Sequence, residues 1–132
     1  MITGIGHVGI WVSDLERSLE FYLSIPTIEE AFRLYKEDGS LMLVYLRLSP
    51  GQFLELFPGG SASEGGNSGY FHACLQTADI HALHQELLKR GLSPRTLPKK
   101  YDDDHSWQFW IDDPDGNPIE FQQLTAESLQ LK

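Results

Sequence analysis

The run GIGHVGIWVSDL, residues 4–15, returns later in the chain as GYFHACLQTADI, residues 69–80. At an offset of 65 residues the coinciding positions are Gly4 and Gly69, His7 and His72, and Asp14 and Asp79. Both runs pass into a stretch whose apolar residues recur with helical spacing. Self-similarity at a fixed offset indicates an internal repeat, so the two halves of the chain should share one structural plan.

Each half predicts the same order of elements around its copy of this run. Apolar strand-like runs predict strands over residues 5–12 and 69–77, and each strand precedes a short amphipathic helix. Asp79 is the expected N-cap of the second helix, whereas Ser13 and Glu16 fit a capping box for the first. Further strands are predicted over residues 28–36, 40–48, 52–57, 94–98, 107–112 and 118–123. The result is two copies of a β-α-β-β-β module.

A Gly- and Ser-rich stretch at residues 58–68 separates the halves and is typical of a linker. We therefore expect one α+β domain over residues 1–132, made of tandem βαβββ modules at residues 1–60 and 66–124. One short helix cannot cover both faces of a four-stranded sheet. We expect the uncovered faces to form a cupped mixed β-sheet, and the protein to form a homodimer.

Composition limits the partners of such a domain. The 132 residues contain ten Lys and Arg against nineteen Asp and Glu, a formal net charge of −9. A surface of this sign repels phosphate backbones and anionic lipids, so neither nucleic acid nor a membrane is an expected partner. The single cysteine, Cys74, allows no internal disulfide, and the N-terminus lacks the basic and apolar regions of a signal peptide. We expect a cytoplasmic, unanchored protein.

Each half also begins with a strand histidine and ends with a strand glutamate. His7 precedes Glu55 by 48 residues, and His72 precedes Glu120 by the same number. Both glutamates lie in apolar strand runs, where an unpaired carboxylate is costly to bury. A lone strand His or Glu usually faces water, but four of them at repeat-equivalent positions favour joint binding of a divalent ion, with positions left for water or substrate.

Two residues beside these histidines are candidates for substrate binding. Strand alternation puts Trp11 on the face of His7, where it is either a substrate platform or a packing residue. Cys74 shares the face of His72 and would line the same cup, although a small buried hydrophobe is the simpler interpretation.

Trp107 is a third candidate for substrate binding. It ends an acidic stretch, residues 99–107, that is either a solvated loop or a lid over the site. His81 and His84 lie on the second predicted helix and are expected at the surface. The acidic residues of the run Asp113-Pro114-Asp115-Gly116-Asn117 are expected to serve the turn itself, through hydrogen bonds to the local backbone.

The runs Gly4–Tyr22 and Asp112–Phe121 resemble the opening and the closing hairpin of the vicinal oxygen chelate superfamily, which contains glyoxalase I. The resemblance covers nearly the whole chain. It implies two βαβββ modules, a cupped sheet and a divalent metal that chelates neighbouring substrate oxygens. The metal ligands that it implies are His7, Glu55, His72 and Glu120, which match residue by residue the His-Glu-His-Glu set of glyoxalase I.

The ligand set separates branches of this superfamily. Methylmalonyl-CoA epimerases resemble the opening run but carry Gln where Glu55 stands. Fosfomycin-resistance enzymes and extradiol dioxygenases bind metal with two His and one Glu, so that Glu55 would be surplus. The set therefore favours the lyase-isomerase branch.

The resemblance implies a metal-dependent lyase or isomerase acting on a small α-oxygenated carbonyl compound, or on its thiol adduct, through an enediolate. Glu120 is the expected base and Glu55 the alternative. Two His and two Glu accept Ni, Co, Zn, Mn or Fe. Glyoxalase I of the common bacterial type holds glutathione with an Arg and an Asn where this chain has Trp11 and Gly59. These differences argue against tight capture of a glutathione adduct.

Two other functions remain open. A ligand-sequestering protein of the bleomycin-resistance type would suit the charge of −9 and would hold a cationic drug, but it has no need of the four metal-ligand residues. An extradiol-type dioxygenase would need Fe(II) and would consume oxygen with a catechol. It is the less favoured alternative, because most such enzymes are longer than this chain.

Overall fold

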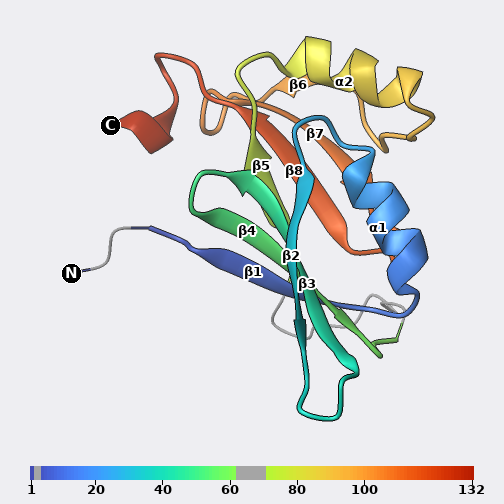
Figure 1. Ribbon diagram of the computed structural model, residues 1–132. Coiled ribbons are helices and arrows are strands. Elements are labelled where there is room, and N and C mark those ends of the chain that lie inside the picture. Colours follow the sequence, from blue (N-terminus) through green and yellow to red (C-terminus); the bar gives the residue numbers. More distant parts are fainter. Residues whose placement is uncertain (2–3, 62–70) are drawn as a thin grey trace. The chain divides into compact units, whose positions relative to one another are not determined.

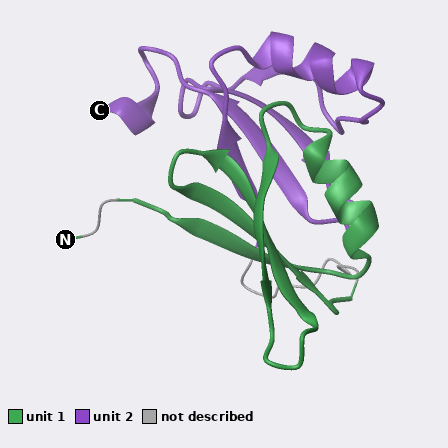
Figure 2. Ribbon diagram, in the orientation of Figure 1, with its two compact units in different colours: residues 1–64 green, residues 65–132 purple. Residues whose placement is uncertain are grey.

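The computed structural model describes Met1 and residues 4–61 and 71–132, which form two compact units, residues 1–64 and 65–132 (Figures 1 and 2). The division falls between the two copies of the repeat. Most of the predicted linker, residues 62–68, lies outside the described residues, and so does the start of the strand predicted over residues 69–77.

Unit 1 combines one helix with a four-stranded mixed sheet. Its elements are β1 (His7–Val12), α1 (Leu15–Leu23), β2 (Glu29–Tyr35), β3 (Leu41–Ser49) and β4 (Gln52–Pro58). The strand order is β1-β4-β3-β2, with β1 and β4 parallel and the other neighbours antiparallel. Parallel neighbours need a long connection, and α1 with the β2–β3 hairpin supplies it here.

Unit 2 repeats this plan. Its elements are β5 (Ala73–Gln76), α2 (Ile80–Lys89), β6 (Lys99–Lys100), β7 (Trp107–Asp112) and β8 (Pro118–Gln123), followed by the short 3₁₀ helix η1 (Leu129–Leu131). The strand order is β5-β8-β7-β6, with β5 and β8 parallel. The predicted α+β fold of two β-α-β-β-β modules is confirmed.

Each α-helix begins after an aspartate whose side chain caps it. Asp14 Oδ1 accepts a hydrogen bond from Arg17 N–H at 3.1 Å, and Asp79 Oδ1 accepts one from Ala82 N–H at 2.9 Å. Both aspartates have the extended backbone of an N-cap. The Asp79 cap is confirmed, whereas the capping box predicted from Ser13 is wrong because the cap lies one residue later. No helix among the described residues is long and apolar enough to span a membrane.

Strand alternation gives each sheet one apolar face and one that carries chemistry. The buried apolar side chains of unit 1 include Ile10, Val12, Leu19, Tyr22, Val44, Leu46, Leu54 and Leu56. Those of unit 2 include Ile80, Leu87, Phe109, Ile111, Ile119 and Phe121. Full burial of one such side chain contributes about 1.5–3 kcal/mol. The opposite face of each sheet is called its pair face, because it carries the His–Glu pair described below.

Two predictions about unit 2 are wrong. The strand expected over residues 94–98 is instead β6, because Pro94 and Pro98 have no backbone N–H to donate to a neighbouring strand. His84, expected at the surface, is only 4% exposed, and its ring meets Phe109 edge-on at a centroid distance of 5.1 Å. It belongs to the core of unit 2, because it lies on the buried side of α2 with Ile80 and Leu87.

Candidate functional site

The first His–Glu pair comes from the two parallel strands of unit 1. His7 begins β1, Glu55 lies in the middle of β4, and His7 Nε2 is 3.4 Å from Glu55 Oε2. Glu55 is 6% exposed, whereas 52% of the His7 side chain is exposed. Gly9 pairs with Glu55 in register, and a Cβ at Gly9 would lie 3.3 Å from the Phe57 ring and 3.6 Å from Glu55 Oε2. The glycine therefore leaves room for the buried carboxylate.

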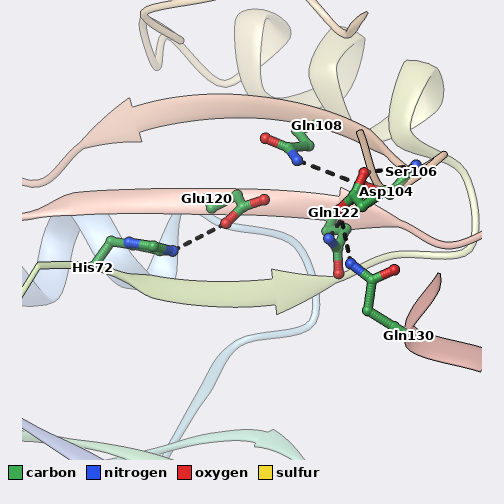
Figure 3. A network of polar contacts seen from close by, with 7 residues as sticks. All are labelled: His72, Asp104, Ser106, Gln108, Glu120, Gln122 and Gln130. Atoms are coloured by element: carbon green, nitrogen blue, oxygen red, sulfur yellow. Dashed lines mark hydrogen bonds and ion pairs between the residues drawn. The ribbon is translucent and has the colours of Figure 1, made fainter. Parts of the chain in front are cut away.

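The second pair comes from the equivalent strands of unit 2 (Figure 3). His72 immediately precedes β5, Glu120 lies in β8, and His72 Nε2 is 3.0 Å from Glu120 Oε2. Glu120 is 7% exposed. Its neighbour in the parallel register is Cys74. Each unit thus contributes one histidine and one buried glutamate from the same two places in its sheet.

A side chain that carries a polar hydrogen lies beside each glutamate. Tyr45 pairs with Glu55 across β3 and β4. The interaction of its hydroxyl with the Glu55 carboxylate, desolvation and the carboxylate charge raise the pKa of Tyr45, so the hydroxyl keeps its proton. Cys74 pairs with Glu120 in unit 2, and partial desolvation of its thiol, followed by the charge of Glu120, raises the pKa of Cys74 to about 12.

An aromatic ring lies edge-on to each histidine. The ring centroids of His7 and Tyr45 are 6.2 Å apart at 77°, and those of His72 and Trp110 are 4.7 Å apart at 66°. Tyr45 and Trp110 occupy equivalent positions of the repeat. Neither residue is among the site residues predicted from the sequence. Counting the antiparallel register back from each glutamate through the predicted turn does identify them.

The donor atoms of each pair are spaced as two ligands of one ion would be. Imidazole nitrogen and carboxylate oxygen bind zinc at about 2.1 Å, so two such ligands lie about 3.0 Å apart at a right angle and about 3.4 Å apart at the tetrahedral angle. The observed separations are 3.0 and 3.4 Å. Among the described residues, no three or more His, Cys, Asp or Glu are grouped so that they could hold an ion, so the structure shows each pair by itself.

Trp11 lies on the pair face of unit 1, beyond Gly9 along β1. It is 63% exposed, and its ring packs on Phe57 at a centroid distance of 5.2 Å. The side chain is therefore on the surface and not in the core. Gly59, the other position that bears on glutathione, follows β4 directly and has a φ of +91°.

The remaining two candidates lie on opposite faces of unit 2. Cys74 is exposed on the pair face beside Glu120, so its interpretation as a small buried hydrophobe is wrong. Trp107 lies on the other face of β7, where its ring meets that of His81 on α2 at 4.9 Å. The helix-facing position arises because Trp107 is an odd number of residues from Trp110, which pairs with Glu120.

A second polar network, separate from the His72–Glu120 pair, lies further along β8 (Figure 3). Gln122, two residues beyond Glu120, is buried and donates from Nε2 to Ser106 Oγ at 3.2 Å. Ser106 Oγ donates to Asp104 Oδ1 at 2.8 Å, and Gln130 Nε2 donates to Asp104 Oδ2 at 2.7 Å. The acidic stretch at residues 99–107, the candidate lid, is thus hydrogen-bonded both to β8 and to η1.

The sequence matches one protein family and one curated relative over most of its length. The model of the Glyoxalase/Bleomycin resistance protein/Dioxygenase superfamily matches residues 4–121. The uncharacterized protein YwbC of Bacillus subtilis (strain 168) is 30% identical over an alignment 130 residues long, which covers 93% of this chain and 99% of that protein.

Solved structures share the fold over almost the whole chain. A glyoxalase family protein from Enterococcus faecalis superposes with a TM-score of 0.74 at 22% identity, covering 90% of this chain and 96% of its own. The genomically encoded fosfomycin resistance protein FosX from Listeria monocytogenes superposes with a TM-score of 0.70 at 20% identity, covering 96% and 98%. At these identities the likeness establishes a common fold.

Proposed function

This chain belongs to the Glyoxalase/Bleomycin resistance protein/Dioxygenase superfamily, and we propose that it is a metal-dependent lyase or isomerase of the glyoxalase I type. Its substrate would be a small α-oxygenated carbonyl compound or the thiol adduct of one. The observation that carries this proposal is the presence of equivalent His–Glu contacts in both units. Burying a carboxylate is unfavourable unless it is paired or binds a metal, so packing alone gives no reason for two such pairs.

The four residues of the two pairs would hold one divalent ion. The assigned ligands are His7, Glu55, His72 and Glu120, contributed by one chain or by two chains of a dimer. Two imidazoles and two carboxylates suit Ni, Co, Zn, Mn or Fe and leave positions for substrate oxygens. When bound, the ion supplies Lewis-acid polarisation of two neighbouring oxygens, which stabilises the negative charge left by removal of a carbon-bound proton.

Glu120 is the proposed base, and Glu55 is the alternative. A carboxylate beside a cation is a weak base, so with an ion bound the Glu120 side chain would have to turn away from it to take the proton from carbon. The backbone of Glu120 is fixed by pairing with β5 on one side and β7 on the other. Its movement is therefore confined to side-chain torsions, which suits proton transfer between two adjacent carbons.

Two of the sequence-based candidates keep a role in substrate binding. Trp11 offers an exposed flat ring on the pair face of unit 1, and Cys74 adjoins the proposed base in unit 2. Trp107 has no place in the site because it faces α2. Trp110, on the pair face of the same strand, takes its place.

The test is exchange of substrate hydrogen with solvent. Protein loaded separately with Ni, Co, Zn, Mn or Fe is incubated in D₂O with α-hydroxy and α-keto carbonyl compounds, with and without several thiols, and followed by NMR. We expect metal-dependent exchange and product with at least one compound. The Glu120→Gln variant should lose both, whereas Glu127→Gln, at an exposed position, should retain them. Finding neither exchange nor product with any combination would contradict the proposal.

Sequestration of a cationic drug is a second candidate function. It is favoured by the net charge of −9 and by the exposed rings of Trp11 and Phe32 on the pair face of unit 1. Analysis of metal in protein purified without chelator separates the two functions. Stoichiometric metal supports the lyase or isomerase, whereas metal-free protein that binds a cationic aromatic drug supports sequestration.

A further inference from the structure

Arg95 lies beside the His72–Glu120 pair of unit 2. Its guanidinium carbon is 5.7 Å from the centroid of the Trp110 ring, and that ring meets the His72 ring edge-on at 4.7 Å. Trp110 pairs directly with Glu120 across β7 and β8. Because one indole contacts both groups, the guanidinium and the imidazole are separated by at most the sum of the two distances, about 10 Å. A small molecule held at the pair can therefore reach this cation.

The ion pair between Arg95 and Asp112 shows which face of the sheet the guanidinium occupies. Arg95 Nη1 is 3.1 Å from Asp112 Oδ1. Asp112 is two residues beyond Trp110 on β7, and alternate residues of a strand face the same side. Both side chains that the guanidinium contacts therefore lie on the pair face, with His72 and Glu120. The cation lies on the pair face as well.

The backbone of Arg95 is fixed against β7. Arg95 N–H donates to Trp110 O at 2.7 Å, and Trp110 N–H donates to Thr96 Oγ1 at 2.9 Å. Both main-chain polar groups of Trp110 are thus bonded to the segment that carries the arginine. The Arg95 side chain therefore starts from a fixed point beside the indole ring.

The ion pair with Asp112 leaves most of the guanidinium fork available. The fork makes one long hydrogen bond to a described residue, from Nη1 to Asp112 Oδ2 at 3.4 Å, whereas Nε and Nη2 donate to none of the described residues. The Arg95 side chain is 48% exposed, and an ion pair this exposed contributes little to stability. A planar fork with free donors matches the geometry of a carboxylate.

We infer that Arg95 binds a carboxylate of the substrate, carried on the same carbon skeleton as the reacting oxygens. The substrate class is then a keto or hydroxy acid whose acidic group lies a few bonds from the reacting carbons. The inference rests on the proposed function. It provides a cation beside the site in a chain whose net charge of −9 otherwise disfavours an anionic substrate.

Two probes that differ in one group test the inference. 2-Oxoglutarate carries a carboxylate a few bonds from its keto group, and its 5-amide is a neutral analogue of the same shape. Binding of each probe to Ni-loaded protein is measured by isothermal titration calorimetry. We expect the acid to bind about tenfold more tightly than the amide, because a charge-assisted hydrogen bond is stronger than a neutral one. Arg95→Gln should remove this preference, and Arg95→Lys should keep part of it.

Two other arginines serve as matched controls. Arg90→Gln removes a cation that pairs with Glu86 of α2, and Arg47→Gln removes an arginine of unit 1 whose Nη1 is 2.6 Å from Glu29 Oε1. Both variants should keep the preference for the acid. All of the variants should bind Ni as the unmodified protein does. For an acid that is turned over, Arg95→Gln should raise KM with little change in kcat, because the contact is made equally in the ground state and the transition state.

The outcomes separate the inference from the proposed function. Equal binding of acid and amide by the unmodified protein, a preference that survives Arg95→Gln, or a preference lost in Arg47→Gln instead would overturn the inference and leave the proposed function standing. A preference that depends on Arg95, without hydrogen exchange or turnover of any carbonyl compound, would support the carboxylate site and contradict the lyase or isomerase. Absence of both Ni binding and probe binding would overturn both.

Discussion

Tyr45 and Trp110 stand at the same position of the two units, each directly across the sheet from a buried glutamate. The repeat thus preserves the histidine, the glutamate and the place of an aromatic ring, but changes the polar group that the ring presents. In unit 1 the ring carries a hydroxyl, whereas in unit 2 it is an indole and the parallel neighbour of the glutamate is Cys74. A duplicated frame therefore carries two chemically different halves.

Glutathione should be a poor cosubstrate. Trp11 and Gly59 stand where the glyoxalase I resemblance places an Arg and an Asn, so two polar contacts to the tripeptide are missing. Each lost charge-assisted contact typically costs about 1.5–3 kcal/mol, or roughly ten- to a hundredfold in kcat/KM. We expect weak or no turnover of the preformed methylglyoxal–glutathione hemithioacetal by the Ni and Zn forms. A kcat/KM of roughly 10⁶–10⁸ M⁻¹s⁻¹ would show that the two positions were misinterpreted.

The protein should be a homodimer in solution. Large apolar side chains are exposed in unit 1, among them Trp11, Phe32, Leu34 and Tyr35. A monomer rarely leaves many such side chains in water, and pairing of two identical chains is the usual remedy. Sedimentation velocity at micromolar concentration should give the mass of a dimer. A single species of monomer mass would refute this prediction.

Stability should fall in acid partly through Asp104. Its carboxylate accepts hydrogen bonds from the Ser106 backbone and hydroxyl and from Gln130, which lowers the pKa of Asp104. A carboxyl whose pKa is lower in the folded state contributes stability that is present above its unfolded pKa of about 3.9 and is lost as pH falls through the folded pKa. Urea unfolding should therefore show Asp104→Asn about 1 kcal/mol less stable at pH 7.

The same measurement at low pH supplies the control for this prediction. The difference between Asp104→Asn and the unmodified protein should shrink below about pH 4, because both then carry an uncharged side chain at this position. A difference that stays constant from pH 7 to strongly acid solution would show that the charge of Asp104 contributes nothing.

The sequence predicts a hairpin well where the turn contains residues, such as Asp, Pro, Gly and Asn, that favour turn conformations. The strands predicted over residues 107–112 and 118–123 are β7 and β8 with the same bounds. Asp113 Oδ1 accepts hydrogen bonds from the backbone N–H groups of Asp115 and Asn117 at 2.9 and 2.8 Å, so the turn fixes the ends of both strands. Residues 94–98 lack such a signal, and their two prolines exclude regular pairing.

The site is less predictable than the fold, because it depends on cross-strand register as well as on spacing. The equal separations of His7 from Glu55 and of His72 from Glu120 are visible in the chain itself. Which side chains adjoin these residues is fixed only by the register of the hairpins. Trp107 was a candidate because it is aromatic and near the acidic loop, but counting the alternation back from Glu120 selects Trp110.

Measurement of bound metal is the most direct test of the proposed four-ligand site. Each of His7, Glu55, His72 and Glu120 is replaced by Ala in turn, and bound metal is measured per chain by elemental analysis after loading with Ni or Zn. His81→Ala, an exposed histidine on α2, is the matched control. We expect one ion per chain in the unmodified protein and in the control, and loss of bound metal in the four ligand variants. Full stoichiometry in any two of those four variants would contradict the proposed site.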